Sequence, residues 1–328
     1  MKKEHTQYLA CPSCDSDLAV TRIDSFKEGS IETGILQCLN CKVNFDIIRY
    51  IPRFVPMENY ASGFGLQWNK HARTQYDSYN GTNISETRFF EETHWPRELH
   101  GSAILEIGSG SGRFTEQAAS TRAMVVSLDY SYAVDANYAS NGHKDNVLIV
   151  QGDIYSMPFK ANFFDRIFCI GVLQHTPDVE RAFFSLPKYL KPGGNLVIDI
   201  YRRNWMYLLT THYWLRPITK RLPAETLYKL VEKYINLMWP VARLINRLPK
   251  GNLINWALSV TDYRGQYPLS EEMLRDWAIL DTFDDLAAFY RNPQTLETVK
   301  KWFTDARLES IEVHYGYNGI EGRATKPS

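Results

Sequence analysis

The sequence predicts an α/β fold, built on a mostly parallel β-sheet with helices on both faces. Short apolar runs recur between residues 103 and 200, and the stretches between them are compatible with helices. Three of these runs end in a carboxylate, and the first is followed by three glycines at alternate positions. Apolar runs bounded by turns are typical of parallel strands that are buried on both faces. The predicted strands cover residues 103–106, 124–129, 147–154, 164–172 and 196–200.

Gly108, Gly110 and Gly112 follow the first predicted strand, and residues 114–120 read as the start of a helix. A strand, a tight glycine turn and a helix form the loop that holds a nucleotide at the end of a parallel strand. The spacing differs from the dinucleotide fingerprint, and the Lys-Ser/Thr of a phosphate-binding loop is missing. Glu106, at the expected carboxyl edge of the strand, would face the ligand and favour a cationic one. A plain glycine-rich turn remains the alternative.

The size and charge of the chain limit its class. Its 328 residues suffice for one large domain and a small one, and 44% hydrophobic and 23% charged residues are normal for a globular protein. The formal net charge is zero, which gives no global attraction to nucleic acid or to an anionic membrane. We find no run of about 18 apolar residues and no apolar signal core. A cytoplasmic protein is therefore expected.

Four of the five cysteines form two C-x-x-C pairs, each followed by strand-like residues. In a reducing compartment this pattern indicates metal binding rather than disulfides, and four thiolates predict a tetrahedral structural zinc site. Residues 1–56 are thus expected to form a zinc domain, in which the metal stabilises a small fold or also helps to contact a partner or substrate. Residues 50–56, bracketed by prolines, read as a rigid linker. The predicted ligands are Cys11, Cys14, Cys38 and Cys41.

Two further strand ends carry acids that suit a nucleoside. Asp129 follows the first glycines by roughly twenty residues, where an acid that accepts from ribose hydroxyls is expected. Tyr130 is placed to pack against an adenine ring. Asp153 can accept from the adenine amino group, with Ile154 packing on the ring. The acids at three successive strand ends fit a ligand with an ammonium group, ribose hydroxyls and an adenine amine, and without phosphate.

These motifs together resemble a known family. Their order and spacing are those of class I S-adenosylmethionine-dependent methyltransferases, over about residues 100–201. Within the class, the sequence is most similar to ubiquinone/menaquinone C-methyltransferases and small-molecule O-methyltransferases. The matching motifs are Glu-x-Gly-x-Gly-x-Gly at 106–112, Asp129, Gly-Asp153, Phe-Asp165 with Val-Leu-Gln-His175, and Leu-Lys-Pro-Gly-Gly at 190–194.

The resemblance implies a Rossmann-like methyltransferase domain over residues 57–328 that binds S-adenosylmethionine. Residues 1–56 resemble the zinc ribbon that is fused to, or paired with, other methyltransferases, on the strength of the four cysteines and the exit Ile-Pro-Arg-Phe-Val-Pro at 51–56. The cofactor-binding residues that follow are Glu106, Gly108, Gly110, Gly112, Asp129, Tyr130, Asp153, Ile154 and Gly171.

The segment 60–95 is expected to lie across the cofactor pocket as a lid. Its first part, residues 64–77, is dense in polar side chains and does not read as a clean amphipathic helix. Residues 86–91 do read as one.

Three residues of this lid are candidates to contact the amino-acid end of the cofactor. They are Gln67, Trp68 and Arg88, and Arg88 would bind the carboxylate by a bidentate contact. Helix surface and core are the alternative roles. His71 reads as a surface histidine, and Cys169, on an apolar strand, reads as a core residue.

Residues 202–258 are predicted to form a helical insertion. From Tyr201 to Trp256, ten basic residues stand against two acidic ones, a net charge of about +8. Aromatic residues are scattered among leucines and isoleucines, which suits a cap over the substrate with a solvated basic face. The pattern also suits peripheral contact with a membrane or a lipid-linked substrate. Nucleic acid is the least favoured partner.

Beyond the insertion, the sequence predicts a helix over residues 296–304 with a threonine cap and two aromatic residues facing inward. Residues 311–319 supply strand material that, by the resemblance, joins an antiparallel hairpin at the sheet edge. Residues 281–284 and 289–295 are expected in loops that face the substrate.

His175, in the loop after the fourth strand, is the best-placed candidate for a catalytic base. Methyl transfer to a hydroxyl or an acidic carbon needs a proton acceptor, and the pKa of histidine suits that role near neutrality. The alternative is that His175 only orients its loop. Asp281, Tyr263 and Tyr290 are weaker candidates for substrate contact.

Three functional hypotheses remain open. The favoured one is an enzyme that methylates a small-molecule, glycan or lipid-linked acceptor at oxygen. The second is an rRNA or tRNA methyltransferase, against which the neutral charge and the missing Asn/Asp-Pro-Pro-Tyr/Phe motif weigh. The third is a scaffold without turnover that uses the zinc ribbon to contact a partner. The sequence settles neither the acceptor nor the oligomeric state.

Overall fold

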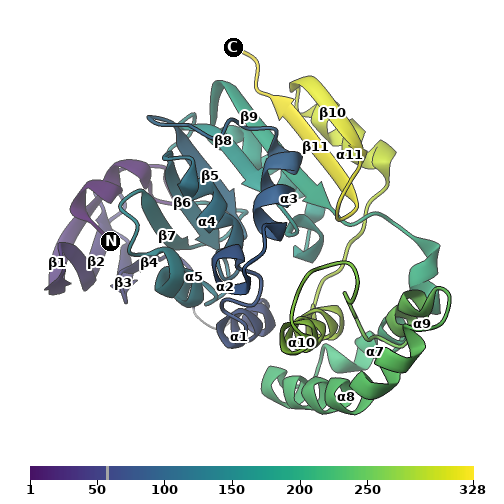
Figure 1. The fold of residues 1–328 in the computed structure, drawn as a ribbon. Coiled ribbons are helices and arrows are strands. Elements are labelled where there is room, and N and C mark those ends of the chain that lie inside the picture. The colour runs from purple at the N-terminus through teal and green to yellow at the C-terminus, as the bar shows by residue number, and fades with distance from the viewer. Residues whose placement is uncertain (57–58) are drawn as a thin grey trace.

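A computed structural model describes residues 1–56 and 59–328, which form one eleven-stranded sheet with helices around it (Figure 1). The predicted α/β fold is confirmed. The strands lie in the order β1 (Leu18–Lys27), β2 (Ser30–Cys38), β3 (Asn44–Ile48), β4 (Ile51–Arg53), β7 (Val147–Gln151), β6 (Met124–Asp129), β5 (Ala103–Ile107), β8 (Phe164–Cys169), β9 (Leu190–Ile200), β11 (Ile320–Thr325) and β10 (Glu309–Tyr315).

Strands β7, β6, β5, β8 and β9 pair in parallel and form the centre of the sheet. Successive residues of a strand point to opposite faces, so Ile104 and Leu105 pack into two different cores. Because both faces are covered, each central strand must be apolar nearly throughout. This explains why the sequence revealed these strands; β9 differs by beginning at Leu190, six residues before the predicted start.

Helices cover both faces of this parallel centre. They are α3 (Ile84–Thr93), α4 (Arg113–Ser120), α5 (Val134–Asn141), α6 (Val179–Ser185) and α11 (Leu296–Asp305), with short 3-10 turns at η1 (Lys3–Tyr8), η2 (Leu173–His175) and η3 (Leu186–Tyr189). The predicted C-terminal helix is confirmed as α11, whose cap Thr295 accepts from the Thr298 amide at 3.2 Å. The edge hairpin is confirmed as well, because β11 pairs antiparallel with both β9 and β10.

The four strands of the N-terminal module extend the same sheet. The prediction of a rigid linker is wrong for residues 51–53. They form β4, which pairs antiparallel with β3 and in parallel with β7. Arg53 fixes this junction from a buried position: its Nη1 donates to Gln151 Oε1 and its Nη2 to Asp135 Oδ1, both at 2.7 Å. The domain boundary after residue 56 stays a prediction, since residues 57 and 58 lie outside the described residues.

The helical insertion forms a lobe beside the carboxyl ends of the parallel strands (Figure 1). It contains η4 (Trp205–Leu209), α7 (Thr211–Thr219), α8 (Ala224–Ile245) and α9 (Gly251–Ala257). The lobe continues into α10 (Glu271–Ala287), so the prediction of a loop over residues 281–284 is wrong. Among the described residues, no helix is long and apolar enough to cross a membrane.

The segment before β5 is also more helical than predicted. Residues 62–70 form α1 (Ser62–Lys70), followed by the single turn α2 (Asp77–Asn80). The sequence of α1 shows no clean amphipathic pattern because the helix packs against both α8 and α10. His71 follows α1 and is buried, with its Nε2 at 2.9 Å from the Tyr228 hydroxyl, so its prediction as a surface residue is wrong. Cys169 is buried, as predicted.

Candidate functional site

A cavity of about 600 Å³ opens at the carboxyl ends of β5, β6, β7 and β8. One wall consists of the loops that follow these strands, and α1 and the insertion form the opposite wall. Loops at the carboxyl ends of parallel strands are where α/β folds bind their ligands. The structure brings nine of the predicted cofactor residues to this cavity, namely Gln67, Trp68, Arg88, Gly108, Gly110, Asp129, Tyr130, Ile154 and Gly171.

The glycine loop makes a narrow floor for the cavity. The Gly110 amide donates to Asp129 Oδ2 at 2.8 Å, and a Cβ at Gly110 would lie 3.0 Å from the Trp68 indole nitrogen. Gly112 has φ +95°, and its Cβ would collide with the Asn137 side chain. Gly112 is thus required for packing on α5, and it does not line the cavity.

Asp129 organises the loop at the end of β6. Besides Gly110, its carboxylate accepts from the amide and the hydroxyl of Ser131, at 2.8 and 2.7 Å. Tyr130 stacks on Tyr60 with ring centroids 4.8 Å apart, which offers a flat apolar surface. Asp153 lies just outside the cavity wall, where it accepts from the Tyr155 amide at 3.0 Å.

Glu106 does not face the cavity, contrary to the prediction. Its side chain points to the same face of β5 as Ile104 and reaches α4, where it accepts from the hydroxyls of Thr115 and, at 2.8 Å, of Ser127. Only 1% of the residue is exposed, and burial raises the pKa of its carboxyl to about 7. Glu106 ties α4 to the sheet beneath the loop.

Gln67 has an unpaired amide group that a ligand in the cavity could bind. It lines the cavity, is 1% exposed, and neither its amide oxygen nor its amide nitrogen has a partner among the described residues. The Ser109 hydroxyl on the glycine loop is likewise buried without a partner there. A buried polar group left unpaired costs about 1–3 kcal/mol. Polar groups of a bound cofactor would satisfy both residues.

Arg88 lines the cavity, but two internal carboxylates engage its guanidinium. Nε donates to Glu92 Oε1 at 2.6 Å and Nη2 to Asp199 Oδ2 at 2.5 Å. Asp199 also accepts from the Gly171 amide, so this network fixes the loop after β8. Arg88 therefore makes single contacts with two carboxylates of the protein, and its bidentate contact with the cofactor carboxylate stays a prediction.

Arg113 is a cavity cation that the sequence reasoning missed. It starts α4, and its Nη1 donates to the Gln75 side chain at 2.7 Å. No carboxylate lies within ion-pair distance of it among the described residues. Burial lowers the pKa of its guanidinium to about 10, which leaves it charged at neutral pH. Its position directly after the last glycine was the available signal.

His175 lines the cavity in η2, between the rings of Phe64 and Tyr201. Its Nδ1 lies 3.1 Å from the Tyr290 carbonyl oxygen, which can only accept, so the proton is on Nδ1 and Nε2 carries the lone pair. Burial lowers its pKa to about 3. His175 is thus neutral at physiological pH and a weak base; its catalytic role stays a prediction.

Three aspartates on one face of α10 form an acidic wall, at spacings of three and four residues. Asp281 accepts from the Tyr263 hydroxyl at 2.6 Å, and Asp285 pairs with Arg291. The Asp284 carboxylate has neither a hydrogen bond nor an ion pair within the described parts of the chain, and burial raises its pKa to about 7. Aromatic residues complete this half of the cavity, namely Tyr201, Tyr207, Trp256, Tyr263, Tyr267 and Trp277.

The four predicted metal ligands meet in the N-terminal module. Their sulfur atoms all lie within 4.8 Å of one another. Cys11 Sγ is 3.6 Å from Cys41 Sγ, and Cys14 Sγ is 3.4 Å from Cys38 Sγ. Four thiolates around a zinc ion at about 2.3 Å stand about 3.8 Å apart, so the cluster has the size and donor set of a tetrahedral zinc site.

Comparison with known proteins agrees with this geometry. Residues 105–198, which span β5 to β9, match the family described as a methyltransferase domain. The chain contains a methyltransferase domain. The central strands and the glycine loop of the cavity floor lie within the matched residues.

Two curated relatives are similar to part of the chain. Over 131 residues it is 30% identical to the ubiquinone biosynthesis O-methyltransferase of Coxiella burnetii, covering 39% of this chain and 56% of that protein. Over 103 residues it is 33% identical to sterol 24-C-methyltransferase ERG6 of Saccharomyces cerevisiae, covering 30% and 27%. The chain thus spans about half or less of these relatives.

Among solved structures, phosphoethanolamine N-methyltransferase 1 of Haemonchus contortus, in complex with phosphoethanolamine and S-adenosylhomocysteine, is 19% identical. The match covers 46% of the present chain and 34% of the phosphoethanolamine N-methyltransferase chain, with a TM-score of 0.37.

Proposed function

We propose that the protein is an S-adenosylmethionine-dependent methyltransferase that methylates a small-molecule, glycan or lipid-linked acceptor at oxygen. The observation that carries the proposal is the two-sided cavity. The loops of the methyltransferase domain form one side, and the other side holds aromatic residues and an unpartnered carboxylate, Asp284. A methyltransferase needs both a cofactor site and an acceptor site that meet in one enclosure.

The residues of the cofactor side fit the parts of S-adenosylmethionine. Asp129 has the acceptor oxygens for ribose hydroxyls, and the stacked Tyr130 and Tyr60 offer a surface for the adenine. Gln67 and Ser109 have unpaired polar groups, and Arg113 has a cation for the carboxylate. When bound, the cofactor supplies a methyl group on a sulfonium, which needs no further activation as a leaving group.

On the acceptor side, Asp284 takes the proton of the acceptor hydroxyl. With a pKa of about 7 it is ionised in part at neutral pH and still basic enough to hold a proton. Burial, and after it the nearby Asp284, raises the pKa of Tyr201, and Tyr201 packs on His175 with ring centroids 5.6 Å apart. His175 acts as a neutral hydrogen-bond acceptor through Nε2, and not as the base.

The acidic wall disfavours an RNA acceptor. Asp281, Asp284 and Asp285 stand in the half of the cavity that an RNA base and its phosphates would enter, and carboxylates repel phosphates. An uncharged, hydroxyl-bearing acceptor with apolar or sugar-ring surface fits the aromatic walls better. The relative of Coxiella burnetii named above is itself an O-methyltransferase.

We further propose that the four cysteines bind a structural zinc ion. The ion would stabilise the end of the sheet formed by strands β1–β4, which continue the central sheet. The catalytic chemistry needs no metal from this site.

The test is transfer of a labelled methyl group from S-adenosylmethionine to cell fractions. We expect label in solvent-extractable lipid or small-molecule material, or in glycan, and none that ribonuclease releases. An Asp129→Ala variant serves as the control, and it should transfer much less label at a low cofactor concentration. Ribonuclease-sensitive label would overturn the acceptor class, and no label in any fraction would overturn the proposed activity.

A further inference from the structure

We propose that the insertion is a docking face for an anionic membrane surface, and that it turns the mouth of the cavity toward the bilayer. The docking itself does not depend on the proposed chemistry. The consequence that an acceptor is taken from the membrane does rest on it.

The first observation is a second apolar stripe on α8. The stripe consists of five exposed side chains on α8 and the turn after it, spaced by seven, four, three and four residues, so they follow one side of the helix. A separate set of residues, which includes Val231 and Ile235, is buried against α10. Leu237 is 75% and Leu244 62% exposed. The stripe residues are Leu230, Leu237, Val241, Leu244 and Leu248.

The second observation is a group of exposed large side chains on η4 and α7. Trp205 is 70% and Trp214 68% exposed, and Leu209 and Ile218 are exposed to a similar extent. The Trp214 indole donates to the Leu208 carbonyl oxygen at 2.9 Å, which holds its ring in place at the surface. Tryptophan with leucine and isoleucine is the composition of helices that lie in the membrane interface.

The third observation is charge. Ten basic and two acidic residues between Tyr201 and Trp256 give about +8 in a chain whose net charge is zero. Lys229, Lys233 and Arg247 are exposed and lie beside the α8 stripe. A basic residue near an anionic leaflet contributes about 1 kcal/mol. This charge favours an anionic bilayer over a second copy of the chain, since pairing two copies would bring like charges together.

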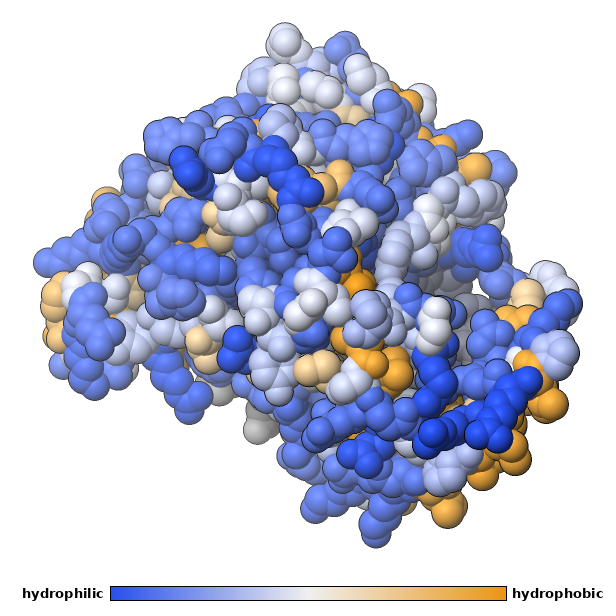
Figure 2. All heavy atoms as spheres, in the orientation of Figure 1, coloured by the Kyte–Doolittle hydropathy of each residue, from blue (hydrophilic) through white to orange (hydrophobic). Residues whose placement is uncertain are grey.

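The fourth observation places the cavity mouth in the same lobe. Asn252 and Leu253 of α9 and Arg202 before η4 line the cavity and are exposed, so the cavity reaches the surface between them. Figure 2 shows apolar residues gathered along the lower right edge of the molecule, over the insertion, next to strongly hydrophilic ones. An amphiphile held by the bilayer would therefore enter the cavity by a short path.

The experiment is flotation of the full, zinc-loaded chain with vesicles of phosphatidylcholine alone or with phosphatidylglycerol. We expect the chain to float with the anionic vesicles, to float much less with the neutral ones, and to be released in part by salt. The double variant Leu237→Glu/Leu244→Glu should weaken the partition by at least about tenfold, because both side chains leave the interface and add repelling charge.

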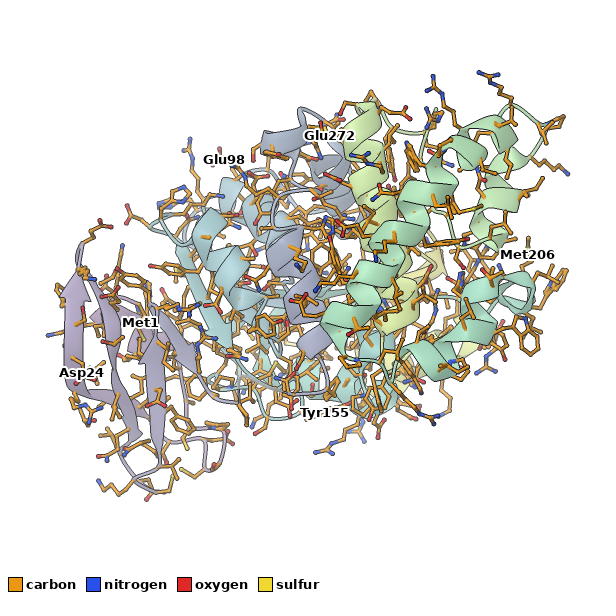
Figure 3. All side chains as sticks on the ribbon, turned by 90° about the horizontal axis from the view of Figure 1, so that it is seen from below. Met1, Asp24, Glu98, Tyr155, Met206 and Glu272 are labelled. Carbon is orange, nitrogen blue, oxygen red and sulfur yellow. The ribbon has the colours of Figure 1, made fainter. Side chains whose placement is uncertain are left out.

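Phe26→Glu is the matched control. Phe26 is 53% exposed on β1, at the end of the molecule opposite to the insertion, as the positions of Asp24 and Met206 in Figure 3 show. This variant should float like the native chain. All three proteins should bind S-adenosylmethionine with equal affinity by calorimetry, which verifies that they are folded. A loss of membrane binding can then be told apart from a loss of cofactor binding.

Three results would overturn the proposal. The first is no flotation with either vesicle. The second is native flotation of the double variant. The third is a dimer, by light scattering, that only the double variant dissociates, because the stripe would then join two copies of the chain.

Discussion

Replacing Asp284 by asparagine tests the assignment of the base. The change keeps the size of the side chain and its place on α10, but it removes the group that takes the proton. A positioned general base contributes about 10²–10⁴-fold to rate, so kcat should fall by that factor. The affinity for S-adenosylmethionine should not change, since Asp284 lies in the acceptor half of the cavity.

The pH profile gives a second, independent readout. With a pKa of about 7, Asp284 is ionised to about one tenth one pH unit below that value and to about nine tenths one unit above it. The native rate should therefore rise about tenfold between about pH 6 and pH 8. The residual rate of the asparagine variant should be flat over this range.

Burial also sets the sign of the effect of Asp284 on stability. Its folded pKa lies above that of an unfolded aspartate, so the folded state binds the proton more tightly and loses stability as pH rises through about 7. The asparagine variant should thus be at least as stable as the native chain at about pH 8, which excludes misfolding as the cause of lost activity.

The assay is single-turnover methyl transfer under saturating cofactor. Asp276→Asn on the same helix is the control; Asp276 does not line the cavity, and this variant should retain the native rate. A native-like kcat in Asp284→Asn, or a native pH profile without a rise near 7, would refute the reasoning. If the rise in rate with pH disappears only in His175→Gln, then His175 and not Asp284 is the base.

Three further outcomes follow from the structure. Asp129→Ala removes the acceptor of the Gly110 and Ser131 amides and the proposed acceptor of the ribose hydroxyls, and should weaken the affinity for S-adenosylmethionine about 10- to 100-fold by calorimetry; unchanged affinity would contradict its role. The pKa of the buried Glu106 carboxyl is about 7 in the folded state, above its usual 4.5. Protonated Glu106 therefore stabilises the folded state at low pH, and this contribution to the free energy of unfolding is lost as the pH rises through about 7. In thermal melts from about pH 5 to 9, Glu106→Gln should therefore lose less stability than the native chain, and an equal loss would argue against this shift. Chelation of zinc, or Cys38→Ser, should lower the melting temperature by several degrees, whereas a zinc-free chain of native stability would contradict a structural metal.

The parallel strands could be predicted because each is buried on both faces and reads as an apolar run, as in residues 124–129. β4 could not, because its three residues carry two features of a linker, a proline and an arginine. It becomes a strand by pairing with β3 on one side and with β7 on the other, and the buried contacts of Arg53 with Gln151 and Asp135 hold it there. The pairing with β7 depends on a residue about a hundred positions away.

The cofactor side of the site could be predicted in part, because residues at strand ends converge whatever the rest of the chain does. Glu106 was misplaced because the alternation of side chains along β5, and not its proximity to the glycines, decides where it points. Residues 281–284 were expected to face the substrate from a loop, and Asp281 and Asp284 do line the cavity, but from the helix α10. The sequence did not single out Asp284 as a base. Asp284 faces a cavity only because the insertion folds back over the sheet.

The most direct test of the account is calorimetric titration of the zinc-loaded chain with S-adenosylmethionine. We expect one saturable site per chain that competes with S-adenosylhomocysteine and is weakened in Asp129→Ala. A folded, zinc-loaded chain that shows no heat of binding and no thermal stabilisation with either ligand would contradict the claim that this cavity is the site of a methyltransferase.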